Sequence, residues 1–149
     1  DCLNDGGLMN IGLYSKQARV QISKLRNSIL SKKVENNNTV IKSYRASLST
    51  SISEQNKWIT SIQDFYSTSM FRDLLFHVQE EQFSIKEIKK MISDLGLVFS
   101  GFEDLRIVDL FKDENKSSDD LYDLDKWHLF EAKNLKLFKG MYQFWCQKN

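Results

Sequence analysis

Four polar residues stand at spacings that bring them together if the segment around them is a helix. They are Arg72, Asp73, His77 and Glu80. Side chains four or seven residues apart share one helix face, as Asp73 does with His77 and with Glu80. Such a group can orient a nucleophilic atom or remove its proton, so His77, Asp73 and Glu80 are candidate catalytic residues and Arg72 a candidate substrate ligand. A helix stabilised by ion pairs, with His77 buried and hydrogen-bonded, explains the same pattern and stays open as the alternative.

A second candidate site follows the apolar segment Leu8–Tyr14, which the pattern predicts to be a buried strand. Ser15 can then cap a helix whose apolar residues recur at three- and four-residue steps. Open α/β sheets bind their ligands at the carboxyl ends of the strands. Tyr14 and Ser15 are therefore candidate substrate-binding residues. In the alternative interpretation Tyr14 packs in the core and Ser15 only caps the helix.

The elements that must position these residues alternate as an α/β fold requires. Helical patterns cover about residues 16–31, 40–48, 52–65, 67–78, 85–95 and 124–134, and residues 105–111 fit a helix better than a strand. Ser84 and Glu87 have the spacing of a capping box. Two more strands are expected at Leu97–Glu103 and Met141–Cys146. The last has large side chains on both faces, which is typical of a strand buried inside a sheet.

The composition is that of an ordinary globular chain, with 41% hydrophobic residues, 28% charged residues and a net charge of +1. Residues 16–45 hold eight basic residues against Glu35 alone, which indicates a solvated helix face or, as the alternative, a phosphate-binding surface. Given the overall charge, nucleic acid is not expected as a partner. No apolar run has membrane-spanning length. Cys2 and Cys146 lack neighbours at metal-ligand spacing, which predicts reduced thiols, no metal site and a cytoplasmic location.

Five segments of the chain match, in order, the motifs of a known family. They are GGLMNIGLYS at 6–15, FYSTS followed by RDLLFHVQE at 65–80, LGLVFSGFE at 95–103, DKWHLFE at 125–131 and GMYQFW at 140–145. Together they span nearly the whole chain. The chain thus resembles a group of bacterial class I S-adenosylmethionine-dependent methyltransferases, some of which are fused to tetratricopeptide repeats. It departs from them at Phe71, where the family often has Cys, and at Asn134-Leu135, where the family often has Asn-Pro.

The resemblance implies the C-terminal part of a Rossmann-like methyltransferase sheet, a single partial domain over residues 1–149. Leu8–Tyr14 corresponds to the fifth strand, Leu97–Glu103 to the sixth, and Met141–Cys146 to an antiparallel seventh strand inserted between them. Residues 16–95 then form a large helical insertion on the substrate side.

The family binds S-adenosylmethionine with a Gly-rich loop after the first strand and an acidic residue at the end of the second. Neither feature occurs in this sequence. The resemblance therefore implies that the cofactor belongs to the intact parent, that the missing N-terminal half is this chain's partner, and that the chain alone is inactive. The methyl acceptor stays unidentified. A noncatalytic helical protein-interaction module, built on the basic helix 16–31, is the alternative function.

The absence of a fourth strand has a physical consequence for the isolated chain. The strand Leu8–Tyr14 is expected to have an apolar, unpaired edge. An edge of that kind pairs readily with other chains, so the isolated chain is expected to self-associate or to be partly unfolded.

Overall fold

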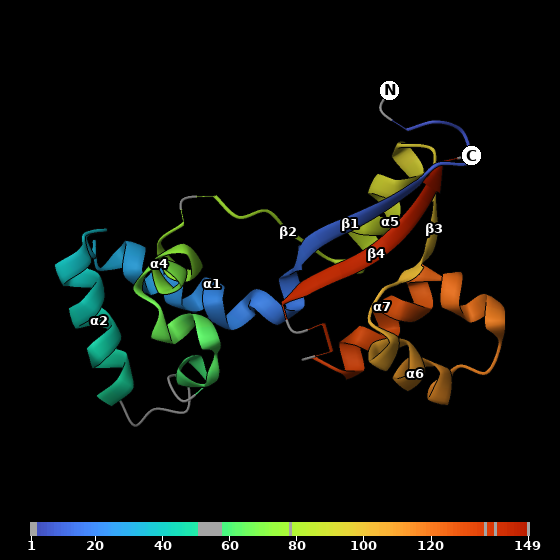
Figure 1. The fold of residues 1–149 in the computed structure, drawn as a ribbon. Coiled ribbons are helices and arrows are strands. Elements are labelled where there is room, and N and C mark those ends of the chain that lie inside the picture. Colours follow the sequence, from blue (N-terminus) through green and yellow to red (C-terminus); the bar gives the residue numbers. More distant parts are fainter. Residues whose placement is uncertain (1–2, 51–57, 78, 136, 139, 149) are drawn as a thin grey trace. The chain divides into compact units, whose positions relative to one another are not determined.

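The structure is a computed structural model that describes residues 3–50, 58–77, 79–135, 137–138 and 140–148. The chain divides into two compact units, one of residues 1–19 with 81–149 and one of residues 20–80, which we call the sheet unit and the helical unit. In chain order the elements are β1 (Leu8–Ser15), α1 (Lys16–Ser31), α2 (Asn38–Thr50), η1 (Ile59–Ser61), η2 (Gln63–Tyr66), α4 (Thr68–Phe76), β2 (Gln82–Phe83), α5 (Ile85–Asp94), β3 (Leu97–Phe102), α6 (Leu105–Glu114), η3 (Ser118–Tyr122), α7 (Leu124–Lys133) and β4 (Met141–Lys148) (Figure 1).

The strands of the sheet unit form one mixed sheet in the order β2-β1-β4-β3. β4 pairs antiparallel with β1 on one side and with β3 on the other, so it lies between two strands that are parallel to each other (Figure 1). The expectation of an antiparallel last strand between the other two is confirmed. The short strand β2, which the sequence pattern did not reveal, pairs in parallel with the end of β1.

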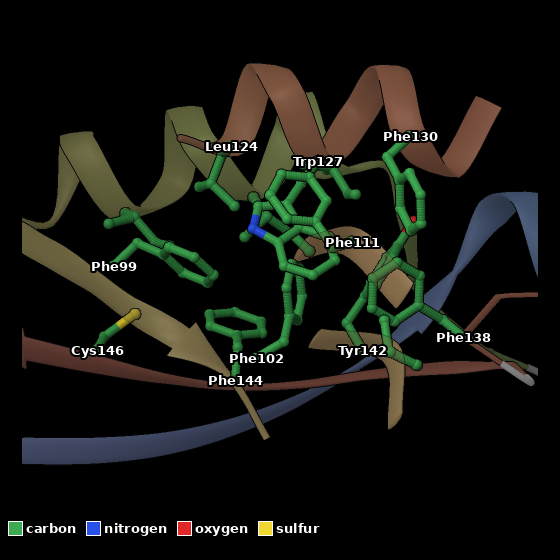
Figure 2. Packing of buried hydrophobic residues seen from close by; sticks show 14 residues of the cluster. Phe99, Phe102, Phe111, Leu124, Trp127, Phe130, Phe138, Tyr142, Phe144 and Cys146 are labelled. Atoms are coloured by element: carbon green, nitrogen blue, oxygen red, sulfur yellow. The ribbon is translucent and has the colours of Figure 1, made fainter. Parts of the chain in front are cut away.

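In the described part of the chain, one face of this sheet is covered and the other is exposed. Tyr142, Phe144 and Cys146 of β4 are fully buried, and they pack with aromatic residues of β3, α6 and α7 (Figure 2). Trp127 stacks on Phe111 in this cluster, with ring centroids 3.8 Å apart. The alternate residues of β4 are exposed, and Trp145 keeps 40% of its surface accessible. The prediction that large side chains on both faces of this strand are buried was therefore wrong for one face.

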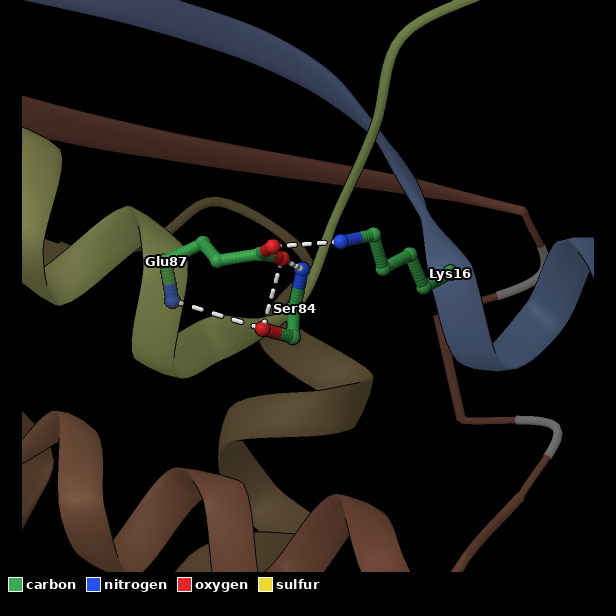
Figure 3. A network of polar contacts seen from close by, with 3 residues as sticks. All are labelled: Lys16, Ser84 and Glu87. Carbon is green, nitrogen blue, oxygen red and sulfur yellow. Dashed lines mark hydrogen bonds and ion pairs between the residues drawn. The ribbon is translucent and has the colours of Figure 1, made fainter.

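Helix α5 begins with the capping box that the sequence predicted. The Ser84 hydroxyl accepts a hydrogen bond from the Glu87 backbone N–H, and the Ser84 backbone N–H donates to the Glu87 carboxylate. Lys16, at the start of α1, forms an ion pair with the same carboxylate (Figure 3). These hydrogen bonds satisfy backbone groups that the first turn of a helix otherwise leaves unpaired.

The compact helical unit ends at Glu80, because the apolar face of α5, formed by Ile85, Ile88 and Ile92, packs into the core of the sheet unit. An insertion over residues 16–95 stays a prediction. A correction concerns the helix expected over 52–65: Ile59–Ser61 and Gln63–Tyr66 form the short 3-10 turns η1 and η2, and residues 51–57 lie outside the described part.

The helical unit has its own apolar core. Ile41, Ile59 and Phe71 are fully buried and come from three different elements of that unit. Among the described residues, none of the helices combines the length and the apolar character that crossing a membrane requires.

Candidate functional site at the carboxyl edge of the sheet

The carboxyl ends of β1 and β3 lie at the same edge of the sheet, because these two strands are parallel. Ser15 stands at this edge as the last residue of β1. Its side chain is fully buried, and its hydroxyl accepts a hydrogen bond from the backbone N–H of Ala18 at 3.2 Å. The Ser15 N–H donates to the carbonyl of Gly140 at 3.0 Å. Ser15 therefore caps α1, and its role as a substrate ligand stays a prediction.

Ser15 also belongs to a buried polar cluster with two residues that lie far away in the sequence. The hydroxyls of Ser15 and Tyr142 both donate to Oε1 of Glu131, at 3.0 and 2.7 Å respectively. Glu131 has only 5% of its surface exposed, and Tyr142 has none. The cluster joins the end of β1, the last turn of α7 and the start of β4, and we call it the Ser15–Glu131–Tyr142 cluster.

Burial governs the acid–base properties of this cluster. Desolvation raises the pKa of the Glu131 carboxyl above its ordinary value, and the hydrogen bonds from Tyr142 and Ser15 offset only part of that effect. Burial also raises the pKa of the Tyr142 hydroxyl, with a further contribution from its hydrogen bond to Glu131. A carboxyl group with a raised pKa is typical of functional sites and of buried structural clusters alike.

Tyr14 is accessible, in contrast to Ser15. It is paired with Met141 in the β1–β4 ladder, and its ring lies under the guanidinium group of Arg19, with Cζ 4.1 Å from the ring centroid. This cation–π contact fixes the ring at the carboxyl edge of β1. Tyr14 is thus placed where a ligand of an α/β sheet binds, although its role as a substrate ligand stays a prediction.

A cavity of about 250 Å³ opens at the same edge, beside the end of β3. Its floor is apolar and includes Phe102, Ile107 and Phe138. Asp104 and Arg106 form an ion pair on its rim, with Nη2 2.7 Å from Oδ2, and the Arg106 guanidinium holds the pKa of the Asp104 carboxyl below its ordinary value. The cavity therefore offers an apolar floor and a rim of nearly zero net charge.

The four residues around α4 do not form the helical constellation that the sequence predicted. Helix α4 ends at Phe76, and His77 is already extended, with φ −63° and ψ 132°. Glu80 thus leaves the helix face, and its carboxylate binds Arg26 with Nη2 2.8 Å from Oε2. The predicted continuation of the helix to Val78 falls on a residue outside the described part.

Arg72, another member of this group, binds a residue outside it. Arg72 donates to the side-chain carbonyl of Asn38, while Asp73 and His77 are exposed, so the alternative with His77 buried is wrong as well. All four residues belong to the helical unit, whereas Tyr14 and Ser15 belong to the sheet unit. The role of these residues in binding or catalysis stays a prediction.

Glu131 and Tyr142 were not among the residues that the sequence singled out. A signal was present, because Glu131 occurs at helical spacing with Leu124 and Trp127, both of which are buried. An acidic residue within the apolar stripe of a helix is unusual, since carboxylates are seldom buried without a partner. No pattern in the sequence, however, identifies Ser15 as that partner, 116 residues away.

The residues present do not fit S-adenosylmethionine binding through a Gly-rich loop. Gly6 and Gly7 precede β1, and their N–H groups donate to the carbonyls of Lys148 and Asn4. The Gly7 amide closes a turn and the Gly6 amide pairs with the end of β4, so neither N–H group is available to a ligand. Within the described residues no group of histidine, cysteine and acidic side chains has the geometry of a metal site. Burial raises the pKa of the Cys146 thiol to about 11, which keeps it protonated and unreactive.

Comparison with protein-family models and with curated proteins finds no match to this chain.

Proposed function

We propose that this chain is the C-terminal, substrate-side half of a bacterial class I S-adenosylmethionine-dependent methyltransferase domain that acts in the cytoplasm. The observation that carries the proposal is the order β1-β4-β3, with the antiparallel last strand between two parallel ones. In the family that the sequence resembles, the fifth, seventh and sixth strands have this order. The three segments that the resemblance assigns to these strands, residues 8–14, 97–103 and 141–146, fall on β1, β3 and β4.

The proposed acceptor site lies at the carboxyl edge of the sheet. Tyr14, held by Arg19, and the apolar cavity beside Phe102 are both at this edge. S-adenosylmethionine supplies the methyl group when it is bound by the other half of the domain. The residues of this chain would hold the acceptor and exclude water from it, which is most of what methyl transfer requires from a protein.

The open edge of β1 supports the proposal that the other half of the domain is the partner. β2 pairs with β1 only at Tyr14 and Ser15, and no described residue pairs with the outer side of Leu8–Leu13. The uncovered sheet face beside this edge carries the exposed side chains of Leu8, Val98 and Trp145. A fourth strand and its following helix would cover apolar surface that is otherwise in contact with water.

Calorimetric titration of S-adenosylmethionine tests the proposal. The ligand is titrated into this chain and into a longer chain that includes the upstream half, and binding is expected only for the longer chain. The matched control is the longer chain with the glycines of its cofactor loop replaced by alanine, which should abolish binding. Binding by neither chain rejects the methyltransferase proposal, and binding by the short chain shows that the cofactor site has been misplaced.

The noncatalytic interaction module is the second candidate, and the exposed basic residues of the helical unit favour it. Lys24, Lys32, Lys33 and Lys42 are all exposed. If this function is correct, charge reversal at Lys32 and Lys33 abolishes binding to an acidic partner. The longer chain then does not bind S-adenosylmethionine.

A further inference from the structure

The Ser15–Glu131–Tyr142 cluster buries the side chain of Glu131, a residue with only 5% of its surface exposed. Within the described residues Glu131 forms no ion pair, and its hydrogen bonds come from two hydroxyl groups. Removing an ionised carboxylate from water costs several kcal/mol unless a cation or several donors compensate. The arrangement therefore suits a neutral carboxylic acid better than a carboxylate.

The hydrogen-bond partners of Glu131 permit a neutral carboxylic acid. The Ser15 hydroxyl accepts from the Ala18 N–H, so its single proton is available for Glu131, and the Tyr142 hydroxyl has one proton as well. Both hydroxyls donate to Oε1, so a protonated Glu131 can carry its own proton on Oε2. Burial raises the pKa of Glu131, in agreement with this assignment.

The charged and titratable groups around the cluster come from several elements. His128, one turn earlier on α7, lies close enough to favour ionisation of Glu131, and its buried Nδ1 has no hydrogen-bond partner among the described residues. Glu87 of α5 acts on Tyr142 through its negative charge, and Lys16 of α1 forms its ion pair with Glu87. Asp125 is near His128 on the same helix. Of these groups, only a protonated His128 opposes the effect of burial on Glu131.

The cluster holds the parts of the chain that shape the carboxyl edge. Ser15 is bonded to Gly140 through its N–H, and the neighbouring Tyr14 is paired with Met141. We propose that the Ser15–Glu131–Tyr142 cluster is a proton-dependent latch, closed while Glu131 is protonated and loosened when its proton passes to solvent. Loosening frees the start of α1 and the turn at Gly140, and with them Tyr14. This inference depends on the fold and does not require the proposed methyltransferase function.

The sign of the pH effect follows from proton linkage. A closed state with a raised pKa binds the proton more tightly than an open state in which Glu131 has the ordinary value near 4.5. Opening therefore becomes up to about tenfold more favourable per pH unit between the ordinary and the raised pKa, and is constant above the raised value. The stabilisation from the proton is complete at low pH and is lost as the pH increases through the raised pKa.

Two NMR measurements on the same sample test the latch. The side-chain carboxyl carbon of Glu131 is titrated, and amide hydrogen exchange, corrected for the intrinsic pH dependence, is followed at Ser15, Tyr14 and Met141. We expect Glu131 to titrate above the ordinary range of glutamate, and the protection of these three amides to decrease as pH rises toward its midpoint. Titration at the ordinary value, or protection that is constant with pH, overturns the proposal.

Two variants separate the latch from general effects of pH. Glu131→Gln keeps an oxygen that accepts both hydroxyl protons but cannot ionise, so its amide protection should not change with pH. Tyr142→Phe keeps the ring and removes one donor to the carboxylate. The pKa of Glu131 should therefore rise further, and the loss of amide protection should shift to higher pH. The proposal fails if Glu131→Gln shows the same pH dependence as the natural chain, or if Tyr142→Phe leaves the midpoint unchanged.

Discussion

The two units bury a glutamate in opposite ways. In the helical unit, Glu80 is paired with Arg26, whose Nε also donates to the carbonyl of Leu74 at 2.8 Å. In the sheet unit, Glu131 has two hydroxyl donors and no ion-pair partner in the described part of the chain. A neighbouring guanidinium favours the ionised form of a carboxyl group, whereas burial in an apolar core favours its neutral form. The charge of a buried acid is therefore set by its partners rather than by its burial alone.

Breaking the buried ion pair should have the largest effect on stability. Arg26→Met removes a guanidinium group that forms an ion pair with the buried Glu80 carboxylate, and breaking a buried ion pair typically costs about 3–5 kcal/mol. We expect this loss in the helical unit at pH 7, measured by native-state hydrogen exchange on amides of α1 and α4. The double variant Arg26→Met with Glu80→Met should recover most of the stability. Equal losses in the single and double variants would show that the pair contributes packing and not charge compensation.

The next largest effect on stability is expected at the helix caps, which differ between the two units. Ser84 is part of a complete capping box in the sheet unit, whereas the Ser67 hydroxyl accepts from Met70 N–H at 3.5 Å, the limit of a hydrogen bond. Ser84→Ala is expected to cost about 1 kcal/mol and Ser67→Ala less than about 0.5 kcal/mol. Thermal unfolding of the two variants gives the comparison. A larger loss for Ser67→Ala would contradict it.

The acid sensitivity of the sheet unit should depend on an exposed carboxylate, in contrast to the buried Glu131. Hydrogen bonds from Lys16 and Ser84 lower the pKa of Glu87 to about 2. Its contribution to stability is therefore complete above the ordinary pKa of 4.5 and is lost as the pH falls through about 2. Carboxyl NMR titration checks the value, and Lys16→Met, which removes the largest cause, should raise the pKa of Glu87. An unchanged midpoint in Lys16→Met would assign the shift to Ser84.

The smallest effect on folding is expected at the open edge of the sheet. Leu8 is 58% exposed beside the unpaired edge of β1, and Leu30 of the helical unit is 73% exposed on α1. Leu8→Lys should change stability by less than about 0.5 kcal/mol but should reduce self-association, because a charge on an edge strand opposes pairing with another chain. Sedimentation velocity measures the association. Leu30→Lys is the matched control, and an equal reduction in both variants would mean that added charge alone is responsible.

Much of the fold could be predicted because its elements are defined by local patterns. The apolar period of α5, its Ser84–Glu87 box and the glycine at position 96, with φ +65°, specify a helix and its end within a few residues. The short elements were predicted less well. Two-residue β2 and the 3-10 turns after Trp58 have too few residues to produce a period, so only contacts with the rest of the chain stabilise them.

The candidate site residues were likewise predicted only in part. The placement of Tyr14 at the carboxyl end of a strand followed from the sequence, since a strand that leads directly into a helix has a defined end. The constellation around α4 was wrong because helical spacing assumes that the helix continues, and the backbone becomes extended at His77. That change of direction lets Glu80 reach Arg26, 54 residues earlier, which no local pattern reveals.

The sequence by itself determined three of the four strands in the described sheet, most helix boundaries, the N-terminal cap of α5 and the apolar residues of both cores. Each of these depends on hydrogen bonds or side-chain spacing within about ten residues. Only the tertiary structure decided that β2 joins the sheet beside β1, that one face of the sheet is exposed in the described part of the chain, and that Glu131 is enclosed by Ser15 and Tyr142. The contacts of β2 and Glu131 join segments between 11 and 116 residues apart, and they exist only because packing of the core brings those segments together.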